Sequence, residues 1–250
     1  MRRESLQMGG WRRCQTNKDL GIGKGIKIAH VDSGINRWHP HINNVAGGIA
    51  LKVTREGKIE LSNDITDRLG HGTAVAGVFS EQVPEAQVWA VKVFDQELFT
   101  HIEVLCAAME WCIQQEMDII NLSLSVKKDI KAFQEICEEV EKAGIIIVSS
   151  CDKRRGLKWP GSYQSVFGVE TGELARPDLC FYNPDEEISF QAYGLPRQLE
   201  GPMQKYNLNG HSFAAAYVSS YIAKIKEKYE VKSKNEIMMK LKEICLEEVL

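Results

Sequence analysis

Five short apolar runs, rich in valine and isoleucine, alternate along the chain with segments of helical periodicity. The runs are IKIAHVD (26–32), QVWAVKVF (87–94), DIINLSL (118–124), GIIIVSS (144–150) and SVFGVE (165–170). Runs that are apolar nearly throughout are typical of strands covered on both faces. Because these strands alternate with helices, we predict a parallel sheet built from βαβ units. In such sheets, sites form beyond the carboxyl ends of the strands.

Two of the segments between these runs carry apolar residues at helical spacing. In residues 102–115 the apolar face comprises Ile102, Leu105, Met109 and Cys112. In residues 129–144 it comprises Ile130, Phe133, Ile136 and Val140, and Gly144 follows as a stop signal. We therefore predict two amphipathic helices that pack against the sheet.

No internal repeat, low-complexity tract or Pro/Gly/Ser-rich linker divides the 250 residues, which are 44% hydrophobic and 26% charged. We expect one domain over residues 21–250, preceded by an N-terminal extension over residues 1–20. The net charge of −3 gives no bulk electrostatic reason to bind nucleic acid or anionic membranes. No apolar stretch follows the N-terminal arginines, and AGIIIVSSC is too short to cross a bilayer, so we expect a cytoplasmic protein.

The seven cysteines are odd in number, and none forms a CxxC pair. They are Cys14, Cys106, Cys112, Cys137, Cys151, Cys180 and Cys245. Three of them fall on apolar faces of predicted helices, where cysteine acts as a small apolar residue. We predict that all seven are reduced thiols, with neither a disulfide nor a zinc site.

Three polar residues have ordinary structural explanations when each is taken alone. Asp32 ends the first run, where Asp-Ser-Gly also suits a turn. His71 lies between two glycines at a helix start, where histidine is often structural, and Ser212 opens a helical run, where serine is a preferred N-cap. Together they supply the carboxylate, base and nucleophile that acyl transfer requires.

The segments around these residues resemble those of the subtilisin-like serine proteases, the subtilases. GKGIKIAHVDSGI is similar to the family's aspartate segment, GHGTAVAGV to its histidine segment and GHSFAAAYV to its serine segment. PEAQVWAVKVFD, EMDIINLSLS and WPGSYQSVFGVE resemble family core strands in the expected order. The resemblance implies an α/β fold of three layers, with a mostly parallel central sheet flanked by helices. It also implies that Asp32 orients His71, which accepts the proton of Ser212 as this serine attacks a peptide carbonyl.

The resemblance further implies where a peptide substrate binds. The residues that it places around the substrate are Ser123, Leu124, Ser125, Ser149, Ser150, Cys151 and Gly161. The first three lie where subtilases present an extended backbone that pairs with the substrate as an added strand. Ser125 stands where the family usually has glycine, so we expect a narrower or more polar pocket.

The chain departs from the family after its fourth run. Subtilases usually have a Gly-Asn pair there, and the asparagine amide donates to the oxyanion, whereas this chain has Cys151, Asp152 and Lys153. Loss of such a donor costs roughly 10²- to 10³-fold in turnover, a magnitude measured on subtilisin itself. We expect Asp152 or Lys153 to occupy the oxyanion region. Near the nucleophile, His211 replaces the usual threonine and Ala216 the usual proline.

Two further features concern ligands. The connection SEQVPEAQ is short where many secreted subtilases insert a calcium loop, so we expect no bound metal and no cofactor. The stretch GIGKG, residues 21–25, has glycines spaced as in phosphate cradles, but it precedes a strand, whereas a dinucleotide fingerprint follows one.

Two functions are consistent with these observations. One is a cytoplasmic serine endopeptidase of restricted specificity that matures a particular peptide or protein, with residues 1–20 as an inhibitory strap over the cleft. The alternative is a peptide-binding or scaffold protein of the same fold, with little activity because the oxyanion asparagine is missing.

Overall fold

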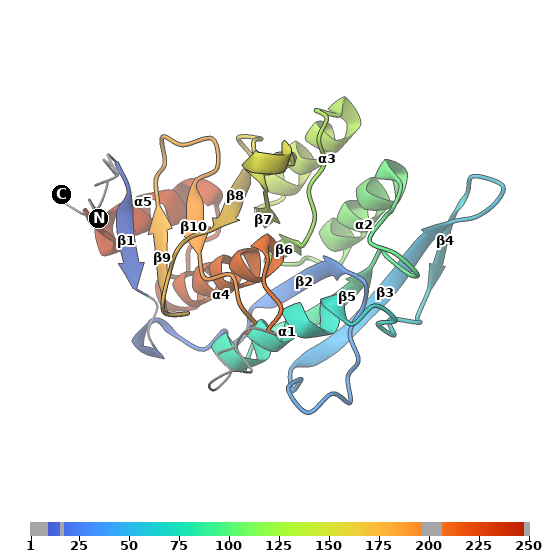
Figure 1. Ribbon diagram of the computed structural model, residues 1–250, viewed down its shortest axis with the longest axis horizontal. Coiled ribbons are helices and arrows are strands. Elements are labelled where there is room, and N and C mark those ends of the chain that lie inside the picture. Colours follow the sequence, from blue (N-terminus) through green and yellow to red (C-terminus); the bar gives the residue numbers. More distant parts are fainter. Residues whose placement is uncertain (1–9, 16–17, 197–206, 248–250) are drawn as a thin grey trace, which may run out of the picture.

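The computed structural model describes residues 10–15, 18–196 and 207–247, and its centre is one twisted sheet (Figure 1). The strands are β1 (Arg12–Gln15), β2 (Lys27–Asp32), β3 (Val45–Val53), β4 (Ile59–Ser62), β5 (Gln87–Lys92), β6 (Ile119–Leu122), β7 (Ile146–Ser150), β8 (Val166–Thr171), β9 (Leu179–Tyr182), β10 (Phe190–Ala192) and β11 (Leu246–Glu247). Within the described residues their order in the sheet is β11-β1-β9-β10-β8-β7-β6-β2-β5-β3-β4. From β10 to β3 neighbouring strands run parallel, and the antiparallel pairs lie at both ends.

Helices cover both faces of this sheet. They are α1 (His71–Gln82), α2 (Ile102–Gln114), α3 (Lys131–Lys142), α4 (His211–Tyr229) and α5 (Lys234–Ile244), with short 3-10 turns η1 (Lys18–Leu20) and η2 (Lys153–Arg155). One buried cluster joins α1, α4 and α5 to one face, and a second joins α2 and α3 to the other. The predicted α/β fold of three layers, with a mostly parallel sheet between helices, is thereby confirmed.

The predicted elements agree with the structure within a few residues. All five apolar runs form strands, and both amphipathic segments form helices, α2 and α3. Leu105, Met109 and Cys112 are buried as expected, whereas Ile102, in the first turn of α2, is only partly covered. Gly144, just beyond α3, has a φ of +80°, the left-handed conformation that makes glycine an effective helix stop.

The alternation of side chains along β2 determines which layer each residue meets. Ala29 and Val31 pack with α2 and α3 in one cluster, while Ile28 packs with α1 and α4 in the other. Because side chains alternate with a period of two, His30 and Asp32 face the same layer as Ile28. The strand therefore directs two polar side chains toward the start of α1.

The glycine-rich stretch GIGKG holds a carboxylate of the chain itself. The backbone N–H groups of Ile22, Gly23 and Lys24 donate to Oε2 of Glu227 at 2.8, 2.6 and 3.1 Å. A Cβ on Gly21 would lie 2.4 Å from the same oxygen, so this glycine is required for the close approach. The stretch is an anion cradle whose occupant comes from α4.

Part of the N-terminal segment belongs to the sheet. β1 pairs antiparallel with β9 and with β11, and Trp11, Cys14 and Leu20 are buried. Residues 12–15 thus pair at one end of the sheet, and η1 (residues 18–20) contacts α4, while the rest of the predicted strap, residues 1–9 and 16–17, lies outside the described residues.

The prediction that all seven cysteines are reduced is wrong for two of them. Cys14 and Cys245 form a disulfide across 231 residues of sequence, with their Cα atoms 4.5 Å apart. The pairing of Arg13 in β1 with Leu246 in β11 places these two cysteines side by side. Local spacing cannot indicate such a bond, because it depends on the two ends of the chain meeting at one edge of the sheet. The other five are free thiols.

This disulfide should close most of the chain into one loop and stabilise the fold by about 2–4 kcal/mol, mainly by restricting the unfolded state. We expect dithiothreitol to lower the urea midpoint of the native protein and of Cys106→Ser, but not of a Cys14→Ser/Cys245→Ser double variant. Thiol titration of the oxidised, denatured protein should find five free thiols. Seven thiols in air-oxidised protein would contradict the pairing.

Candidate active site

Asp32 and His71 form a hydrogen-bonded pair between the sheet and the first helix. Asp32 is the last residue of β2 and is fully buried, and His71 is the first residue of α1. Nδ1 of His71 lies 2.7 Å from Oδ1 of Asp32. The same oxygen accepts the backbone N–H of Ser33 at 2.6 Å. Nδ1 of His71 therefore carries the proton, which leaves Nε2 free to act as a base.

The ionisation of the pair follows from this contact. Burial disfavours a charge on His71, but the hydrogen bond and negative charge of Asp32 outweigh it, so the pKa of His71 is raised. Burial also opposes ionisation of Asp32, yet the hydrogen bonds that its carboxylate accepts from His71 and from the backbone N–H of Ser33 hold its pKa below the usual value. Asp32 is thus a carboxylate that orients His71 and stabilises its cationic form.

A second histidine, His30, lies behind the pair. Its Nε2 is 3.1 Å from the carbonyl oxygen of Gly72, and its Nδ1 is 3.3 Å from the Asn121 amide nitrogen. Burial lowers the pKa of His30, so it is neutral, with Nε2–H donating to Gly72 and Nδ1 accepting from Asn121. His30 therefore braces β2 against α1 without adding charge beside Asp32.

Asp67, which the sequence reasoning missed, fixes the loop that leads to His71. It is buried, and its Oδ1 accepts from Ser33 Oγ, Leu69 N and Gly70 N at 2.8–3.0 Å. Its Oδ2 accepts from the backbone N–H and the hydroxyl of Thr73 at 2.8 and 2.6 Å. The available signal was an aspartate four residues before the histidine and six before a threonine, in DRLGHGT.

Ser212 is the second residue of α4, and Gly210, not Ser212, is the N-cap. Its hydroxyl donates to the carbonyl of Ser123 at 3.3 Å, so the side chain does not cap the helix. Its backbone N–H lies in the first turn, where the helix dipole places positive potential. To transfer its proton to His71, the Ser212 hydroxyl must give up its hydrogen bond to the Ser123 carbonyl and donate to Nε2 of His71 instead.

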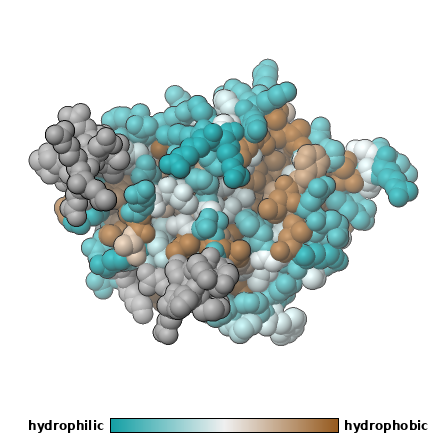
Figure 2. Space-filling view, in the orientation of Figure 1, coloured by the Kyte–Doolittle hydropathy of each residue, from teal (hydrophilic) through white to brown (hydrophobic). Residues whose placement is uncertain are grey.

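A pocket of about 300 Å³ brings most of the predicted site residues together. Its lining consists of His71, Phe94, Leu98, Ser123, Leu124, Ser125, Ser150, Cys151, Asp152, Arg155, Leu157, His211 and Ser212. Asp32 lies beneath this surface, in contact with His71. Leu98 and Phe99, in the loop before α2, are 58% and 63% exposed, and Figure 2 shows hydrophobic surface over this part of the molecule.

Ser149 and Gly161 support the pocket without lining it. Ser149 Oγ donates to the Leu124 carbonyl at 3.0 Å, which fixes the chain that follows β6. A Cβ on Gly161 would lie 2.2 Å from Sγ of Cys151, so glycine is needed there for close packing. Burial raises the pKa of the Cys151 thiol to about 12, which makes it a poor competing nucleophile.

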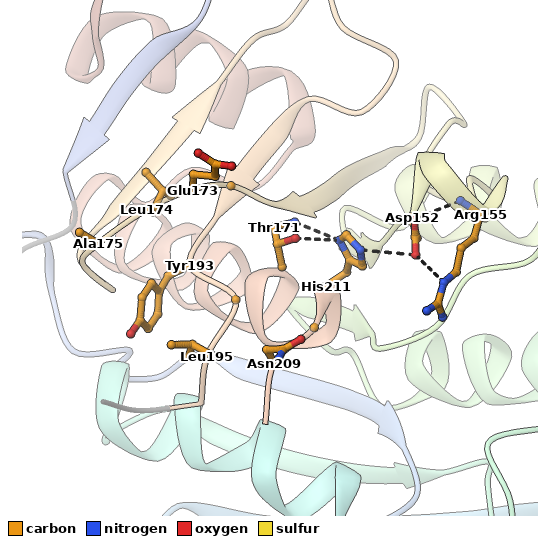
Figure 3. A pocket seen from close by; sticks show the side chains of 13 residues that line it. Asp152, Arg155, Thr171, Glu173, Leu174, Ala175, Tyr193, Leu195, Asn209 and His211 are labelled. Carbon is orange, nitrogen blue, oxygen red and sulfur yellow. Dashed lines mark hydrogen bonds and ion pairs between the residues drawn. The ribbon is translucent and has the colours of Figure 1, made fainter. Parts of the chain in front are cut away.

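Asp152 reaches the pocket, but it acts there as an acceptor. Its Oδ1 accepts the backbone N–H of Arg155 at 3.1 Å, which caps η2. Its Oδ2 lies 3.4 Å from Nε of Arg155 and 3.6 Å from Nε2 of His211 (Figure 3). Lys153 is not in the pocket: its backbone N–H and its Nζ face Glu170, at 2.6 and 4.0 Å, and Nζ also faces Glu186.

The described residues contain no cluster of three or more His, Cys, Asp or Glu side chains arranged to hold a metal ion. None of their helices combines the length and the apolar character needed to cross a membrane. The expectation of no bound metal and no cofactor stays a prediction.

Comparisons with known proteins identify the family of this chain. The profile of the subtilase family matches residues 23–245. The chain is 31% identical over 230 residues to the major intracellular serine protease of Bacillus subtilis, and the match covers 84% of this chain and 71% of that protein. It is 27% identical to a thermostable alkaline protease of Halalkalibacterium halodurans (88% of this chain, 62% of the relative) and 26% identical to subtilisin E of Bacillus subtilis (83% and 57%).

The family profile covers nearly the whole chain, and all three relatives are named as proteases or subtilisins. The matched segment includes Asp32, His71 and Ser212, together with every strand from β2 to β10. The chain therefore belongs to the subtilase family of serine-type endopeptidases.

Proposed function

We propose that this chain hydrolyses peptide bonds through Ser212 as nucleophile, His71 as general base and Asp32 as the residue that orients His71. The observation that carries the proposal is the 2.7 Å contact between His71 and buried Asp32, with His71 and Ser212 lining one pocket. The pair provides a base with a fixed tautomer, and α4 presents the nucleophile at a helix N-terminus.

The residues support a two-step reaction. Ser212 Oγ forms a bond to the carbonyl carbon as its proton passes to Nε2 of His71, and the carbonyl electron pair moves onto oxygen. The oxyanion then reforms the carbonyl and expels the amine, which takes the proton from His71. Water, deprotonated by the same nitrogen, releases the acyl group and restores Ser212. Asp32 remains ionised throughout and stabilises the imidazolium.

We further propose restricted specificity and a role in maturing a particular peptide or protein. Ser123–Ser125 lines the pocket between the end of β6 and the β-bridge at Val126, a position that suits strand-like pairing with a substrate backbone. Leu98, Phe94 and Leu157 give the pocket apolar walls.

Two observations bear on a cytoplasmic location. The name of one relative, the major intracellular serine protease of Bacillus subtilis, supports it. The Cys14–Cys245 disulfide argues against it, since disulfides are rare in reducing compartments.

Replacement of the nucleophile gives the direct test. Ser212→Ala should lower turnover of a cleaved peptide on the order of 10⁴- to 10⁶-fold and abolish labelling by a fluorophosphonate, which requires an activated serine. Ser62→Ala, an exposed serine on β4, is the matched control and should retain both activities. A folded native protein that neither cleaves peptides nor reacts with the probe would favour the peptide-binding alternative.

The dependence of the rate on pH should report His71. Because His71 must be neutral to accept a proton, and its pKa lies above the ordinary value of 6.5, kcat/KM should rise through a midpoint above 6.5. The rate is lost as pH falls through that pKa. The measurement is hydrolysis of a fluorogenic peptide from about pH 5 to 9, with unfolding followed in parallel. A midpoint at or below 6.5, with the protein folded, would contradict the Asp32–His71 contact.

A further inference from the structure

His211 precedes Ser212 and is the first residue of α4. The backbone N–H of Thr171, the last residue of β8, donates to Nδ1 of His211 at 3.0 Å, and the Thr171 hydroxyl lies 3.4 Å from the same nitrogen (Figure 3). A ring nitrogen that accepts a backbone hydrogen bond carries no proton. The end of β8 therefore fixes His211 as the neutral tautomer with its proton on Nε2.

The Nε2–H of His211 points toward a carboxylate oxygen but does not form a hydrogen bond of normal length with it. It faces Oδ2 of Asp152 across 3.6 Å, longer than the roughly 2.7–3.2 Å of an N–H···O hydrogen bond. Arg155 partly neutralises the Asp152 carboxylate: its backbone N–H donates to Oδ1, and its Nε lies 3.4 Å from Oδ2. The His211 side chain is 30% exposed and lies between two pockets: it lines the pocket that also holds His71 and Ser212, and the neighbouring pocket drawn in Figure 3.

Among the described residues that line this pocket, none is the asparagine whose amide donor subtilases normally use in peptide hydrolysis. Oxyanion stabilisation needs a hydrogen-bond donor beside the backbone N–H of the nucleophile. The residue at the expected place is Asp152, whose carboxylate can only accept. Lys153 is turned toward Glu170 and Glu186, and the Arg155 guanidinium is 78% exposed and directed at Asp152.

We propose that His211 supplies this second donor: its neutral imidazole donates Nε2–H to the oxyanion, with Thr171 fixing its tautomer and Asp152 aiming the ring. His211 transfers no proton, so the bond changes remain those of Ser212 and His71. The inference rests on the proposed endopeptidase function and adds a catalytic residue to it. Thr171 and Asp152 are positioning residues, since they act through His211.

The test compares side chains with and without a donor at the position of Nε2. His211→Phe keeps the ring and removes the donor, and we expect kcat to fall roughly 10²-fold while KM changes less than about 3-fold. His211→Gln places an amide N–H close to the position of Nε2 and should recover kcat to within about 10-fold of the native value. His211→Asn, one methylene shorter, should not. His101→Phe, an exposed histidine outside the pocket, is the control for removal of an imidazole.

A peptidyl aldehyde separates a catalytic role from a structural one. Ser212 adds to its carbonyl and creates a tetrahedral oxygen at the place of the oxyanion. We expect His211→Phe to weaken aldehyde inhibition about as much as it lowers kcat/KM, and to leave inhibition by the matching product peptide unchanged. Equal weakening of both inhibitors would mean that His211 only shapes the pocket, and would overturn the proposal.

Asp152→Asn provides an independent check, because it adds an amide donor where the family has one and removes the negative charge. Turnover should rise about 10-fold, and His211→Phe should then cost less than about 3-fold in the Asp152→Asn background. Equal losses in the two backgrounds would overturn the proposal. If His211→Phe does not fold, the Gln and Asn variants carry the same comparison.

Failure of this inference differs from failure of the proposed function. Native kcat retained in His211→Phe and His211→Asn, with Ser212→Ala inactive, overturns the role of His211 alone. A native protein that cleaves no peptide and binds no aldehyde overturns both.

Discussion

The hydrogen bond between His71 and the buried Asp32 carboxylate joins the sheet to the helical layer at the site. It depends on close backbone approach: a Cβ on Gly72 would lie 2.2 Å from the carbonyl oxygen of Gly34 and 3.2 Å from Oδ1 of Asp32. Two buried side chains hold this approach. Asp67 fixes the loop before α1 through hydrogen bonds to both of its carboxylate oxygens, and neutral His30 joins β2 to α1 through the carbonyl of Gly72. Any displacement of α1 would therefore change both the tautomer and the basicity of His71.

The opposite wall of the pocket is organised around a departure from the family. Asp152 caps η2 and contacts Arg155 and His211, so it stabilises a short turn where other members have an amide donor. His211 replaces the usual threonine at the adjacent position. The two unusual residues contact each other, which suggests one local solution to oxyanion stabilisation: a fixed imidazole in place of an asparagine.

Much of the fold was predictable from sequence, and the residues of the candidate site could be named from it. Apolar runs and helical spacing identify β2, β5, β6, β7, β8, α2 and α3, because two-sided burial leaves a strong local pattern. Asp32, His71 and Ser212 were predictable because acyl transfer requires their side-chain types and the flanking segments resemble the family. The structure brings His71 and Ser212 to one pocket and Asp32 beneath it, which is consistent with their predicted roles.

What the sequence did not reveal depends on contacts between distant segments. The Cys14–Cys245 disulfide requires the chain ends to meet, and the cradle for Glu227 requires α4 to cross residues 22–24. The directions of Lys153 and His211 are decided by Glu170 and Thr171, on the neighbouring strand β8. No local sequence pattern indicates contacts between distant segments, so the sequence alone identifies these side chains but not their partners.

The central claim is that Ser212 becomes covalently acylated during turnover. The most direct measurement is a brief incubation with an activated peptide ester, acid quenching, and mass spectrometry of the intact protein and its fragments. The account predicts one added acyl group, mapped to Ser212. An acyl group on Cys151 or His211 would contradict it. So would rapid cleavage of the ester with no acylated protein trapped, even at a low pH that slows deacylation.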